Sequence, residues 1–361
     1  MATPSTLFAP LRLRGVEFRN RVFVSPMCQY SAADGVPGDW HLVHLGSRAV
    51  GGAGLVLTEA TAVTAEGRIS PGCTGLWTDG QARAFAPLAA FVAAHGAVPG
   101  VQLAHAGRKA STALPWLDGG PLAPDDGGWE TVAPSAVPFG PGHRAPRELS
   151  APEIDDLVTH FAAATSRAAD AGFRVVEIHM AHGYLLHEFL SPLSNRRTDE
   201  FGGVLENRAR FPLQVAAAVR AAFPAAQPVF VRISATDWVA GGWDLPQSVQ
   251  LARWLKNAGV DLVDCSSGGL VPDAKVPAGP GYQVPFAAAI RRDAGVPTAA
   301  VGLVTEARQA EQIVASGDAD AVLLARQLLR DPYWPLHAAL ELGADAPWPS
   351  QYLRARTSAP R

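Results

Sequence analysis

The sequence predicts an α/β protein folded as a single (β/α)8 barrel of the TIM type, and three observations support this. Eight short apolar runs rich in β-branched residues recur along the chain, and a helix-like stretch lies between each run and the next. The length of 361 residues is common for one such barrel, and no change of composition divides the chain. No GxGxxG motif opens the first strand-to-helix turn, where an open dinucleotide-binding sheet would need it.

The expected strands are apolar on both faces, as are strands of a parallel sheet that helices cover. They are expected at residues 22–27, 54–60, 99–105, 174–181, 228–234, 261–267, 297–304 and 319–326. Helices are expected at 40–51, 79–95, 151–171, 206–223, 246–258, 284–294, 305–316 and 330–342. Ser150 with Glu153 three residues later is typical of a helix start, and Gly172 and Gly259 are typical of helix ends.

Two segments fall outside the repeat within one domain that spans 1–361. Residues 7–20 alternate in polarity around a glycine turn, which predicts a hairpin that plugs the floor of the barrel. Residues 110–149 are crowded with proline and glycine after the third strand and are too long for a simple connection. Loops of that length usually cover an active site, so we expect a capping segment there.

Composition narrows the class of protein. Apolar residues make up 48% and charged residues 17%, which predicts a large core, and the net charge of −3 gives no basic stripe for nucleic acid. Cys28, Cys73 and Cys265 show neither CxxC spacing nor an even count, which disfavours disulfides and zinc knuckles. Free cysteines of this kind indicate a reducing compartment, so we expect a cytoplasmic protein.

No segment predicts contact with a membrane. The N-terminal stretch MATPSTLFAPLRLRG lacks the unbroken apolar region of a signal peptide. The most apolar window starts at Ala84 and is interrupted by Pro87, His95, Gly96 and Pro99. This window is better interpreted as a helix, a turn and a strand than as a membrane span.

Catalytic groups of such barrels come from the carboxyl ends of the strands. The ends of the last two strands carry Gly302, Ala325 and Arg326, where main-chain N–H groups and a guanidinium can hold a phosphate. Gln102 and Arg232 end two other strands and offer an amide and a cation to the edge of a flat heterocycle. Together these groups predict a site for flavin mononucleotide, FMN.

The stretch HMAHGY sets His179, His182 and Tyr184 within six residues, directly after an apolar run. Three interpretations are open. The side chains ligate a metal, for which His187 and Glu188 are the further candidate ligands. They hold an anionic oxygen, because the i, i+3 spacing lets both imidazoles point at one atom. Or they fill a polar corner of the core.

Five motifs carry a resemblance to a known family. They are SPMCQY at 25–30, QLAHAGRKA at 102–110, HMAHGYLLHEFLSPLSNRRTDEFGG at 179–203, FVRIS at 230–234 and LLRDP at 328–332. Together they resemble the Old Yellow Enzyme family over residues 7–354, nearly the whole chain. Cys28, the paired histidines and the short tail resemble its bacterial thermophilic-like subclass.

The resemblance implies an FMN-dependent ene-reductase. NADPH passes hydride to the flavin, which then reduces the C=C bond of α,β-unsaturated carbonyl or nitro compounds such as enones, enals and maleimides. His179 and His182 are implied to bind the substrate oxygen and stabilise its developing charge. Tyr184 is implied to protonate the carbon opposite the hydride, for which its hydroxyl must be neutral.

The resemblance also implies the other binding residues. The implied FMN contacts are Ser25, Pro26, Met27, Cys28, Ala60, Gln102, Arg232, Gly302, Ala325 and Arg326. Cys28 is implied to modulate the flavin potential as a weak S–H donor or as a thiolate, although free cysteine is often only a buried small hydrophobe. Tyr30 is implied to contact substrate. Arg354, in the tail 343–361, is implied to reach a neighbouring subunit's site, which predicts a homodimer or homotetramer. No metal site is implied.

The chain departs from the family pattern at Ala325, where the family usually has glycine; this change puts only the closeness of backbone approach in doubt. Larger relatives with an iron–sulfur cluster are disfavoured, because three scattered cysteines cannot supply four thiolate ligands. Two functions of a different class stay open. One is a metal-dependent hydrolase or aldolase barrel that uses His179 and His182, and the second is an idle ligand-binding barrel.

Overall fold

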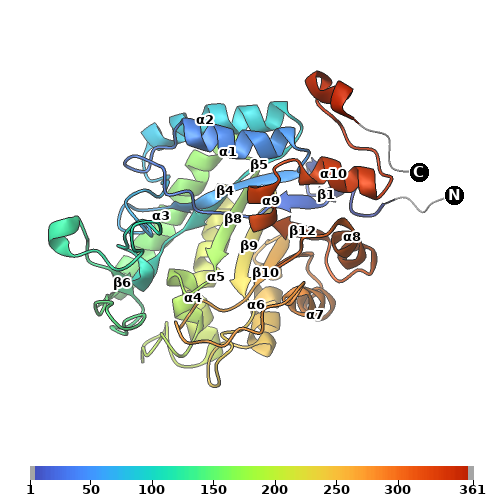
Figure 1. Ribbon diagram of the computed structural model, residues 1–361. Coiled ribbons are helices and arrows are strands. Elements are labelled where there is room, and N and C mark those ends of the chain that lie inside the picture. The colour runs from blue at the N-terminus through green and yellow to red at the C-terminus, as the bar shows by residue number, and fades with distance from the viewer. Residues whose placement is uncertain (1–4, 357–361) are drawn as a thin grey trace.

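A closed barrel of parallel strands forms the centre of the computed structural model, which describes residues 5–356 (Figure 1). Neighbouring strands pair in the order β10-β11-β12-β3-β4-β5-β8-β9, and β9 pairs with β10 to close the ring. The barrel strands are β3 (Val22–Val24), β4 (Leu55–Ala62), β5 (Val98–Ala104), β8 (Val175–Met180), β9 (Val229–Ser234), β10 (Leu262–Ser266), β11 (Thr298–Val301) and β12 (Ala321–Leu324). The predicted (β/α)8 fold is therefore confirmed.

Helices surround the barrel (Figure 1). They are α1 (Asp39–Val50), α2 (Asp79–Ala94), α3 (Ala151–Asp170), α4 (Leu185–Leu190), α5 (Leu205–Ala222), α6 (Leu245–Asn257), α7 (Val284–Ala294), α8 (Ala307–Ala315), α9 (Arg326–Arg330) and α10 (Trp334–Glu341). The capping box at the start of α3 is present, since the Glu153 carboxylate accepts from the Ser150 amide at 2.8 Å. Gly172 and Gly259 follow helices with positive φ, as expected.

The extent predicted for the last helix, residues 330–342, was wrong. The structure has two helices there, α9 and α10, because Asp331 adopts extended backbone before Pro332, and the ring of a proline disfavours helix in the residue before it. The last strand also ends at Leu324 instead of 326, since Arg326 already begins α9.

The N-terminal hairpin closes the floor of the barrel, as the sequence predicted. β1 (Leu11–Leu13) and β2 (Val16–Phe18) pair antiparallel around the turn at Arg14 and Gly15. The ring of Phe18 lies 5.0 Å from that of Phe23 on β3 and 6.2 Å from that of Phe230 on β9, centroid to centroid. These apolar side chains fill the amino-terminal end of the barrel and leave its carboxyl end for polar groups.

The segment 110–149 is ordered by short elements and by arginine contacts. It contains a 3₁₀ turn at Pro124–Asp126 and the paired strands β6 (Val132–Ala133) and β7 (Arg147–Glu148). The Arg108 guanidinium donates to Val137 O at 3.1 Å and to Leu270 O at 2.7 Å. One side chain thus joins this segment to the loop after β10, at the carboxyl end of the barrel.

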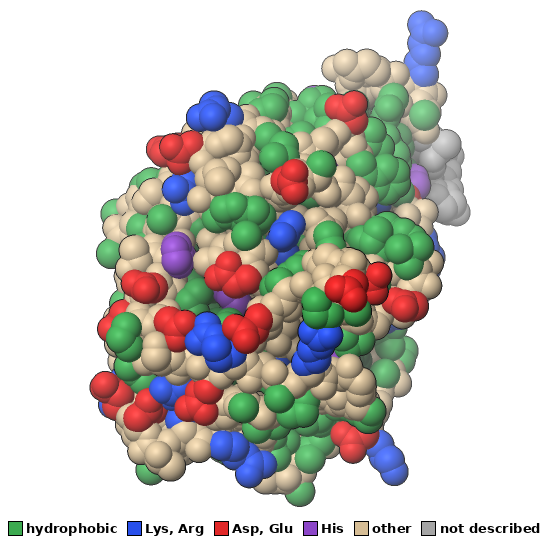
Figure 2. Space-filling model, turned by 90° about the vertical axis from the view of Figure 1, so that its left-hand side faces the viewer, with side chains coloured by type: hydrophobic (Ala, Val, Ile, Leu, Met, Phe, Trp, Pro, Cys, Tyr) green, Lys and Arg blue, Asp and Glu red, His purple; other side chains and the backbone are tan. Residues whose placement is uncertain are grey.

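One face of the molecule carries charged side chains of both signs (Figure 2). Acidic and basic side chains are interspersed over the face turned to the viewer in Figure 2. Among residues 5–356, no helix is both long enough and apolar enough to traverse a bilayer.

Candidate active site

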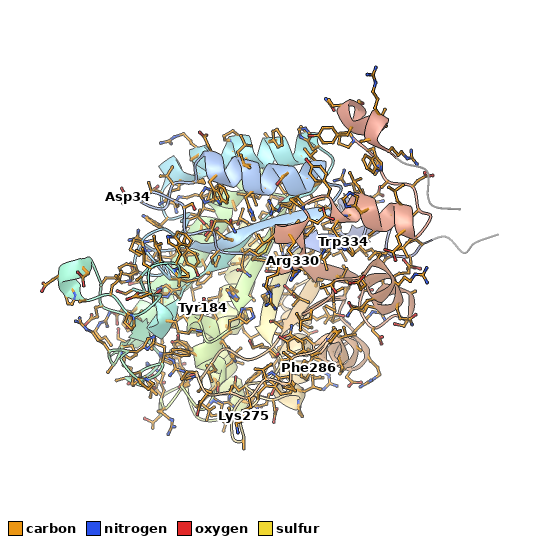
Figure 3. The ribbon with its side chains drawn as sticks, in the orientation of Figure 1. Asp34, Tyr184, Lys275, Phe286, Arg330 and Trp334 are labelled. Atoms are coloured by element: carbon orange, nitrogen blue, oxygen red, sulfur yellow. The ribbon has the colours of Figure 1, made fainter. Side chains whose placement is uncertain are left out.

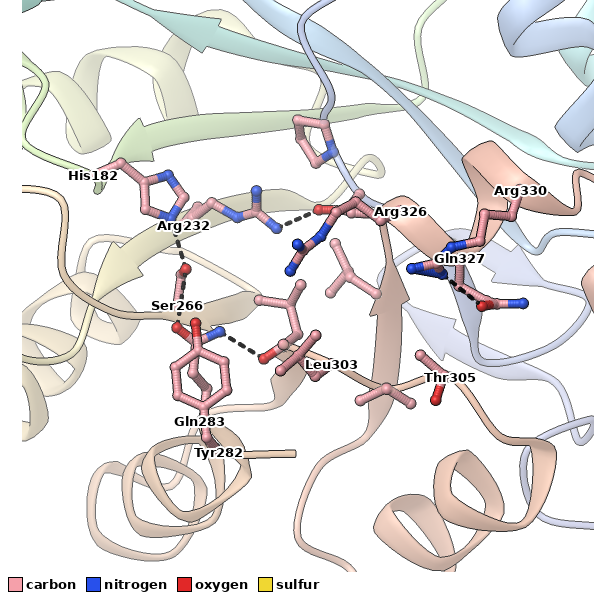
Figure 4. Close-up of a pocket in the computed structure, with 17 residues that line it drawn as sticks. His182, Arg232, Ser266, Tyr282, Gln283, Leu303, Thr305, Arg326, Gln327 and Arg330 are labelled. Carbon is pink, nitrogen blue, oxygen red and sulfur yellow. Dashed lines mark hydrogen bonds between the residues drawn. The ribbon is translucent and has the colours of Figure 1, made fainter. Parts of the chain in front are cut away.

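A cavity of about 260 Å³ opens at the carboxyl ends of β3, β9, β11 and β12. Seven residues predicted from the sequence line it, namely Ser25, Pro26, His182, Arg232, Gly302, Ala325 and Arg326. Figure 4 shows His182, Arg232 and Ser266 on one side of the cavity and Arg326, Gln327 and Arg330 on the other. The lining is polar on both sides, which suits a ligand with a polar ring and a distant anionic group.

The outer end of the cavity is formed by Gly302, Ala325 and Arg326. Gly302 has φ +119°, and a Cβ there would lie 2.6 Å from Nε2 of Gln283, so the position requires glycine. Gln283 in turn donates to Val301 O at 2.7 Å. Arg326 is exposed and its guanidinium is available to an anion, whereas Ala325 supplies only backbone.

The inner end of the cavity is formed by Arg232 on β9. Its Nη2 donates to Ser25 Oγ at 2.7 Å, and its Nε donates to the buried carboxylate of Asp264. Gln102 lies deeper, on β5, and its Nε2 donates to Glu177 Oε1 at 2.8 Å. The predicted amide and cation are therefore both held by buried carboxyl groups.

Met27, Cys28, Ala60 and Gln102 do not belong to the lining of this cavity, although the sequence grouped them with it. The structure brings Cys28 and Ala60 together instead, because the Ala60 backbone N–H hydrogen-bonds to the Cys28 sulfur. Burial, followed by the nearby Cys73 and Glu59, raises the pKa of Cys28 well above its ordinary value. Of the two predicted forms of Cys28, this environment favours the neutral thiol and disfavours the thiolate.

His179, His182 and Tyr184 form a compact aromatic cluster. The ring of His179 lies 5.2 Å from the rings of both His182 and Tyr184, each approached edge-on. His179 is at the end of β8, and its Nδ1 is buried without a hydrogen-bond partner in the described part of the chain. His182 Nε2 lies 2.6 Å from Oγ of Ser266 on β10.

Burial keeps this cluster neutral. It lowers the pKa of His179 well below the ordinary value, and the neighbouring His182 and Arg232 lower it further. Burial and Arg232 act on the pKa of His182 in the same direction. Burial also raises the pKa of the Tyr184 hydroxyl well above its ordinary value. The cluster thus consists of two neutral imidazoles and one protonated phenol at neutral pH.

A strained backbone presents His182 to the cavity. His182 adopts φ +59°, an uncommon conformation for a residue with a side chain. Three contacts hold it there. Its N–H donates to Ser234 Oγ at 2.9 Å, its carbonyl accepts from Lys109 Nζ at 2.8 Å, and its backbone packs against Gly269, where a Cβ would come within 2.8 Å. Such strain persists only where the surroundings fix it, and it is common at active sites.

Helix α4, which follows the His182 loop, carries His187 and Glu188, and both side chains hydrogen-bond to neighbouring groups. His187 Nδ1 accepts from the Gly183 amide at 2.9 Å, and its Nε2 lies 3.0 Å from Asp237. Glu188 accepts from the Arg108 amide at 2.9 Å. Among the described residues, no group of three or more His, Cys, Asp or Glu side chains is arranged to hold a metal ion. His187 and Glu188 thus support the loop from below.

Tyr30 lies near Tyr184 and packs against Trp116. Tyr30 has φ +51°, and its ring lies 6.1 Å from that of Trp116, edge-on. Figure 3 labels Tyr184 over the barrel and Arg330 nearer the C-terminal helices.

Arg354 lies in the 3₁₀ helix Ser350–Ala355, is exposed and does not line the cavity of its own chain. Its predicted role in a neighbouring subunit stays a prediction.

The comparison with known proteins decides the family. Residues 6–344 match the model of the NADH:flavin oxidoreductase / NADH oxidase family. The chain belongs to that family. The chain is accordingly an FMN-dependent oxidoreductase, which confirms the resemblance drawn from its motifs. A metal-dependent hydrolase is therefore not favoured.

Similar proteins cover this chain almost completely. An NADPH dehydrogenase of Geobacillus sp. (strain WCH70) is 49% identical over 96% of this chain and 98% of its own. One from Geobacillus thermodenitrificans is 47% identical over 97% and 98%. Morphinone reductase superposes with a TM-score of 0.79 at 30% identity, covering 95% of this chain and 91% of its own. An Old Yellow Enzyme homologue of Zymomonas mobilis superposes at 0.78, with 26% identity and 99% coverage of both chains.

The cavity fits FMN on the geometry of this chain alone. Gly302 and Arg326 stand at one end for a phosphate, and Arg232 stands at the other for a ring edge. Four further residues of this flavin oxidoreductase site were missed from the sequence, namely Lys109, Glu177, Asp264 and Gln283. For Glu177 and Asp264 a signal was present, since each is a carboxylate two residues before a site residue on the same strand.

Proposed function

We propose that the protein is an ene-reductase that uses NADPH and FMN to reduce the C=C bond of α,β-unsaturated carbonyl or nitro compounds. The observation that carries this proposal is the cluster of His179, His182 and Tyr184, two neutral N–H donors and one neutral acid beside a cavity suited to FMN. The relatives named NADPH dehydrogenase support NADPH as the hydride donor.

Binding of the cofactor is assigned to residues at both ends of the cavity and to neighbouring residues outside its lining. Gly302, Ala325 and Arg326 would hold the phosphate, and Gln102 and Arg232 would hold the ring edge. Ser25, Pro26, Met27, Cys28 and Ala60 would line the ring mainly through backbone groups. When bound, FMN supplies the hydride that adds to the substrate alkene. The Arg232 guanidinium would attract negative charge at that ring edge.

The two imidazoles act on the substrate oxygen. Each neutral ring has one N–H, and the ring centres lie 5.2 Å apart, close enough for both donors to reach one substrate oxygen. As hydride reaches the alkene, charge develops on the carbonyl or nitro oxygen, and two fixed donors stabilise it. Removing one donor of this kind typically costs about 10²–10³ in rate.

Tyr184 supplies the proton. Its phenol is kept protonated by burial, so its hydroxyl can donate to the α-carbon, which is bonded to the polarised carbonyl or nitro group. The phenolate left behind is disfavoured by burial, but the Lys109 ammonium lies 5.0 Å from the ring centre. That cation stabilises the phenolate until it regains a proton.

The substrate end and the assembly complete the proposal. Tyr30, beside Trp116, would contact the substrate ring, and Arg354 would do so from a neighbouring subunit. This requires a homodimer or homotetramer. Enones, enals and maleimides suit a site with one oxygen pocket and an aromatic wall. A cytoplasmic location accords with three free cysteines.

Product analysis tests the reaction. The purified protein receives cyclohexenone and NADPH carrying deuterium at both C4 positions. We expect cyclohexanone with one deuterium on the β-carbon. In D₂O with ordinary NADPH, we expect one deuterium on the α-carbon. Reduction of the carbonyl to an allylic alcohol, or no reduction, contradicts the proposal.

A further inference from the structure

Two carboxyl groups lie inside the barrel below the candidate active site. Glu177 on β8 and Asp264 on β10 are both 0% exposed. Glu177 precedes His179 by two residues, and Asp264 precedes Ser266 by two, so each points to the same inner face as the site residue above it. Two acids in an apolar barrel interior are costly unless their charges are compensated.

Each carboxyl group has one satisfied oxygen and one unsatisfied oxygen. Glu177 Oε1 accepts from Gln102 Nε2 at 2.8 Å, and Asp264 Oδ2 accepts from Arg232 Nε. Within residues 5–356, Glu177 Oε2 and Asp264 Oδ1 are buried and have no N–H donor. The two side chains lie within hydrogen-bonding reach of each other. Two carboxylate oxygens at that distance repel unless a proton lies between them.

We propose that Glu177 and Asp264 share one proton, which resides on Glu177 and makes it the neutral acid that positions Gln102 for FMN. Burial raises the pKa of Asp264 as well, but the Arg232 guanidinium binds this carboxylate directly and favours its ionised form. Glu177 has only a neutral amide as its other partner. The cluster of Arg232, Asp264 and Glu177 therefore carries no net charge.

The groups that face Glu177 favour the same assignment. They are Gln102 from β5, Asp264 from β10 and Arg232 from β9. Burial, followed by the charge of Asp264, raises the pKa of Glu177 to about 8, and Arg232 only partly opposes this. The pair stays singly protonated at neutral pH and loses its proton as the pH rises past that value.

This arrangement matters for the cofactor, and here the inference rests on the proposed function. Gln102 donates to Glu177, which fixes its amide plane and leaves Oε1 free to accept from a ring N–H. When Glu177 is neutral, the single negative charge of Asp264 balances the positive charge of Arg232. An ionised Glu177 would add a second negative charge and disfavour a reduced flavin that bears negative charge. Glu177 is thus a positioning residue that also sets the flavin potential.

Infrared difference spectroscopy of the full-length protein tests the shared proton directly. The wild-type spectrum minus that of Glu177→Gln should contain the C=O stretch of a protonated carboxylic acid, shifted in D₂O. Asp264→Asn should remove the same band, because Glu177 then becomes the counter-ion of Arg232 and ionises. Isotopic labelling of glutamate carboxyls in the wild-type protein gives the same answer if a variant does not fold. Absence of the band at neutral pH would overturn the proposal.

Glu188→Gln is the matched control, because Glu188 is also fully buried and its pKa is also raised to about 8. Any band that it removes should persist in Asp264→Asn. The flavin potential gives a second readout. Glu177→Gln should leave it near the wild-type value at neutral pH and abolish the extra fall of the wild-type potential above about pH 8. A markedly higher potential at neutral pH would mean that Glu177 is ionised.

The experiments distinguish a failure of the shared-proton proposal from a failure of the proposed function. The infrared band depends on this chain alone, so it should be present even if the protein binds no FMN, and the proposed function would then be the one in error. An FMN enzyme that reduces enones but lacks the band would contradict only the shared proton.

Discussion

The Nε2 atom of His182 lies 2.6 Å from Oγ of Ser266, across the top of the barrel from β8 to β10. Ser266 is also 3.4 Å from Oε1 of Gln283, whose amide donates to the end of β11. A side chain that faces the substrate is thereby anchored to residues that line the cofactor cavity. The proposed donors and the cofactor site are one connected set of contacts.

Ser266→Ala should weaken binding of the substrate oxygen, because the His182 ring then loses the hydrogen bond that fixes its orientation. Loss of one hydrogen bond of about 1 kcal/mol predicts roughly fivefold weaker binding of a phenol ligand. His182→Ala removes the donor itself and should slow alkene reduction by about 10²–10³. Stopped-flow absorbance separates this step from flavin reduction by NADPH, which both variants should leave unchanged. Ser267→Ala is the control, since its hydroxyl contacts Gln283 at 2.6 Å instead. Equal losses in both half-reactions would refute the assigned role.

Tyr184→Phe should slow the alkene step alone, because it removes the proton donor and keeps the ring that packs on His179. General acid catalysis by a positioned group contributes typically about 10²–10⁴. Single-turnover oxidation of the reduced enzyme by cyclohexenone measures this step, and the same trace without enone is the blank. An unchanged rate would assign the proton to solvent or to another acid.

Gly302→Ala should weaken retention of FMN. The added Cβ would lie 2.6 Å from Gln283 Nε2 and 2.9 Å from the ring of Tyr282, and φ +119° is poorly accessible to alanine. Gly241→Ala is the matched control, because Gly241 also has positive φ, but a Cβ there would meet nothing within 4 Å among the described residues beyond its chain neighbours. The flavin content after dialysis and the affinity for added FMN measure the effect. Equal loss in both variants would trace it to backbone strain and not to the cavity.

Glu188→Gln should make stability less dependent on pH. Burial raises the pKa of Glu188 from 4.5 to about 8 in the folded chain. Between those values the folded state holds a proton that the unfolded state releases, so wild-type stability falls as pH rises. The variant lacks this loss, which is at most about 1.4 kcal/mol per pH unit.

Thermal unfolding at several pH values from about 5 to about 8 measures this effect as a widening gap in Tm in favour of Glu188→Gln. Glu153→Gln is the control, since the pKa of Glu153 is lowered to about 2 by Arg147 and Ser150. Both of its states are ionised in this window, so its gap should stay constant. A constant gap for Glu188 as well would mean that the folded chain buries a carboxylate there.

Arg354→Ala should raise the KM for an enone and leave FMN content unchanged, because Arg354 is exposed and lies outside the cavity of its own chain. Mass measurement in solution should give a dimer or tetramer. Mixed oligomers of Arg354→Ala and Tyr184→Phe subunits should regain full activity at sites that combine wild-type residues from both chains. No recovery on mixing would limit Arg354 to its own subunit.

The sequence was sufficient for the fold because strand and helix patterns are local. The run of apolar residues at 174–181, for example, contains all of β8, and Gly15 marks the turn of the floor hairpin. The short HMAHGY stretch also predicted that His179 and Tyr184 lie close together, and their rings do so in the structure, while their roles stay predictions. Boundaries were harder, because Gly302 and Asp331 end elements through their backbone conformation.

The contacts between distant strands were beyond the sequence. Glu177 and Asp264 are 87 positions apart as their numbers show, and only the closed barrel brings their side chains together. Lys109 was inside a quoted motif, but nothing local indicated that its ammonium lies beside Tyr184. Registers between strands set these distances, and a single sequence does not reveal registers.

The most direct test of the central claim is the visible absorption spectrum of the purified protein under anaerobic conditions. We expect the bands of oxidised flavin, their bleaching after NADPH is added, and their return after cyclohexenone. That sequence of changes would establish the cofactor, the donor and the acceptor class together. A colourless protein that does not take up added FMN, or a bleached flavin that cyclohexenone fails to reoxidise, would contradict the account.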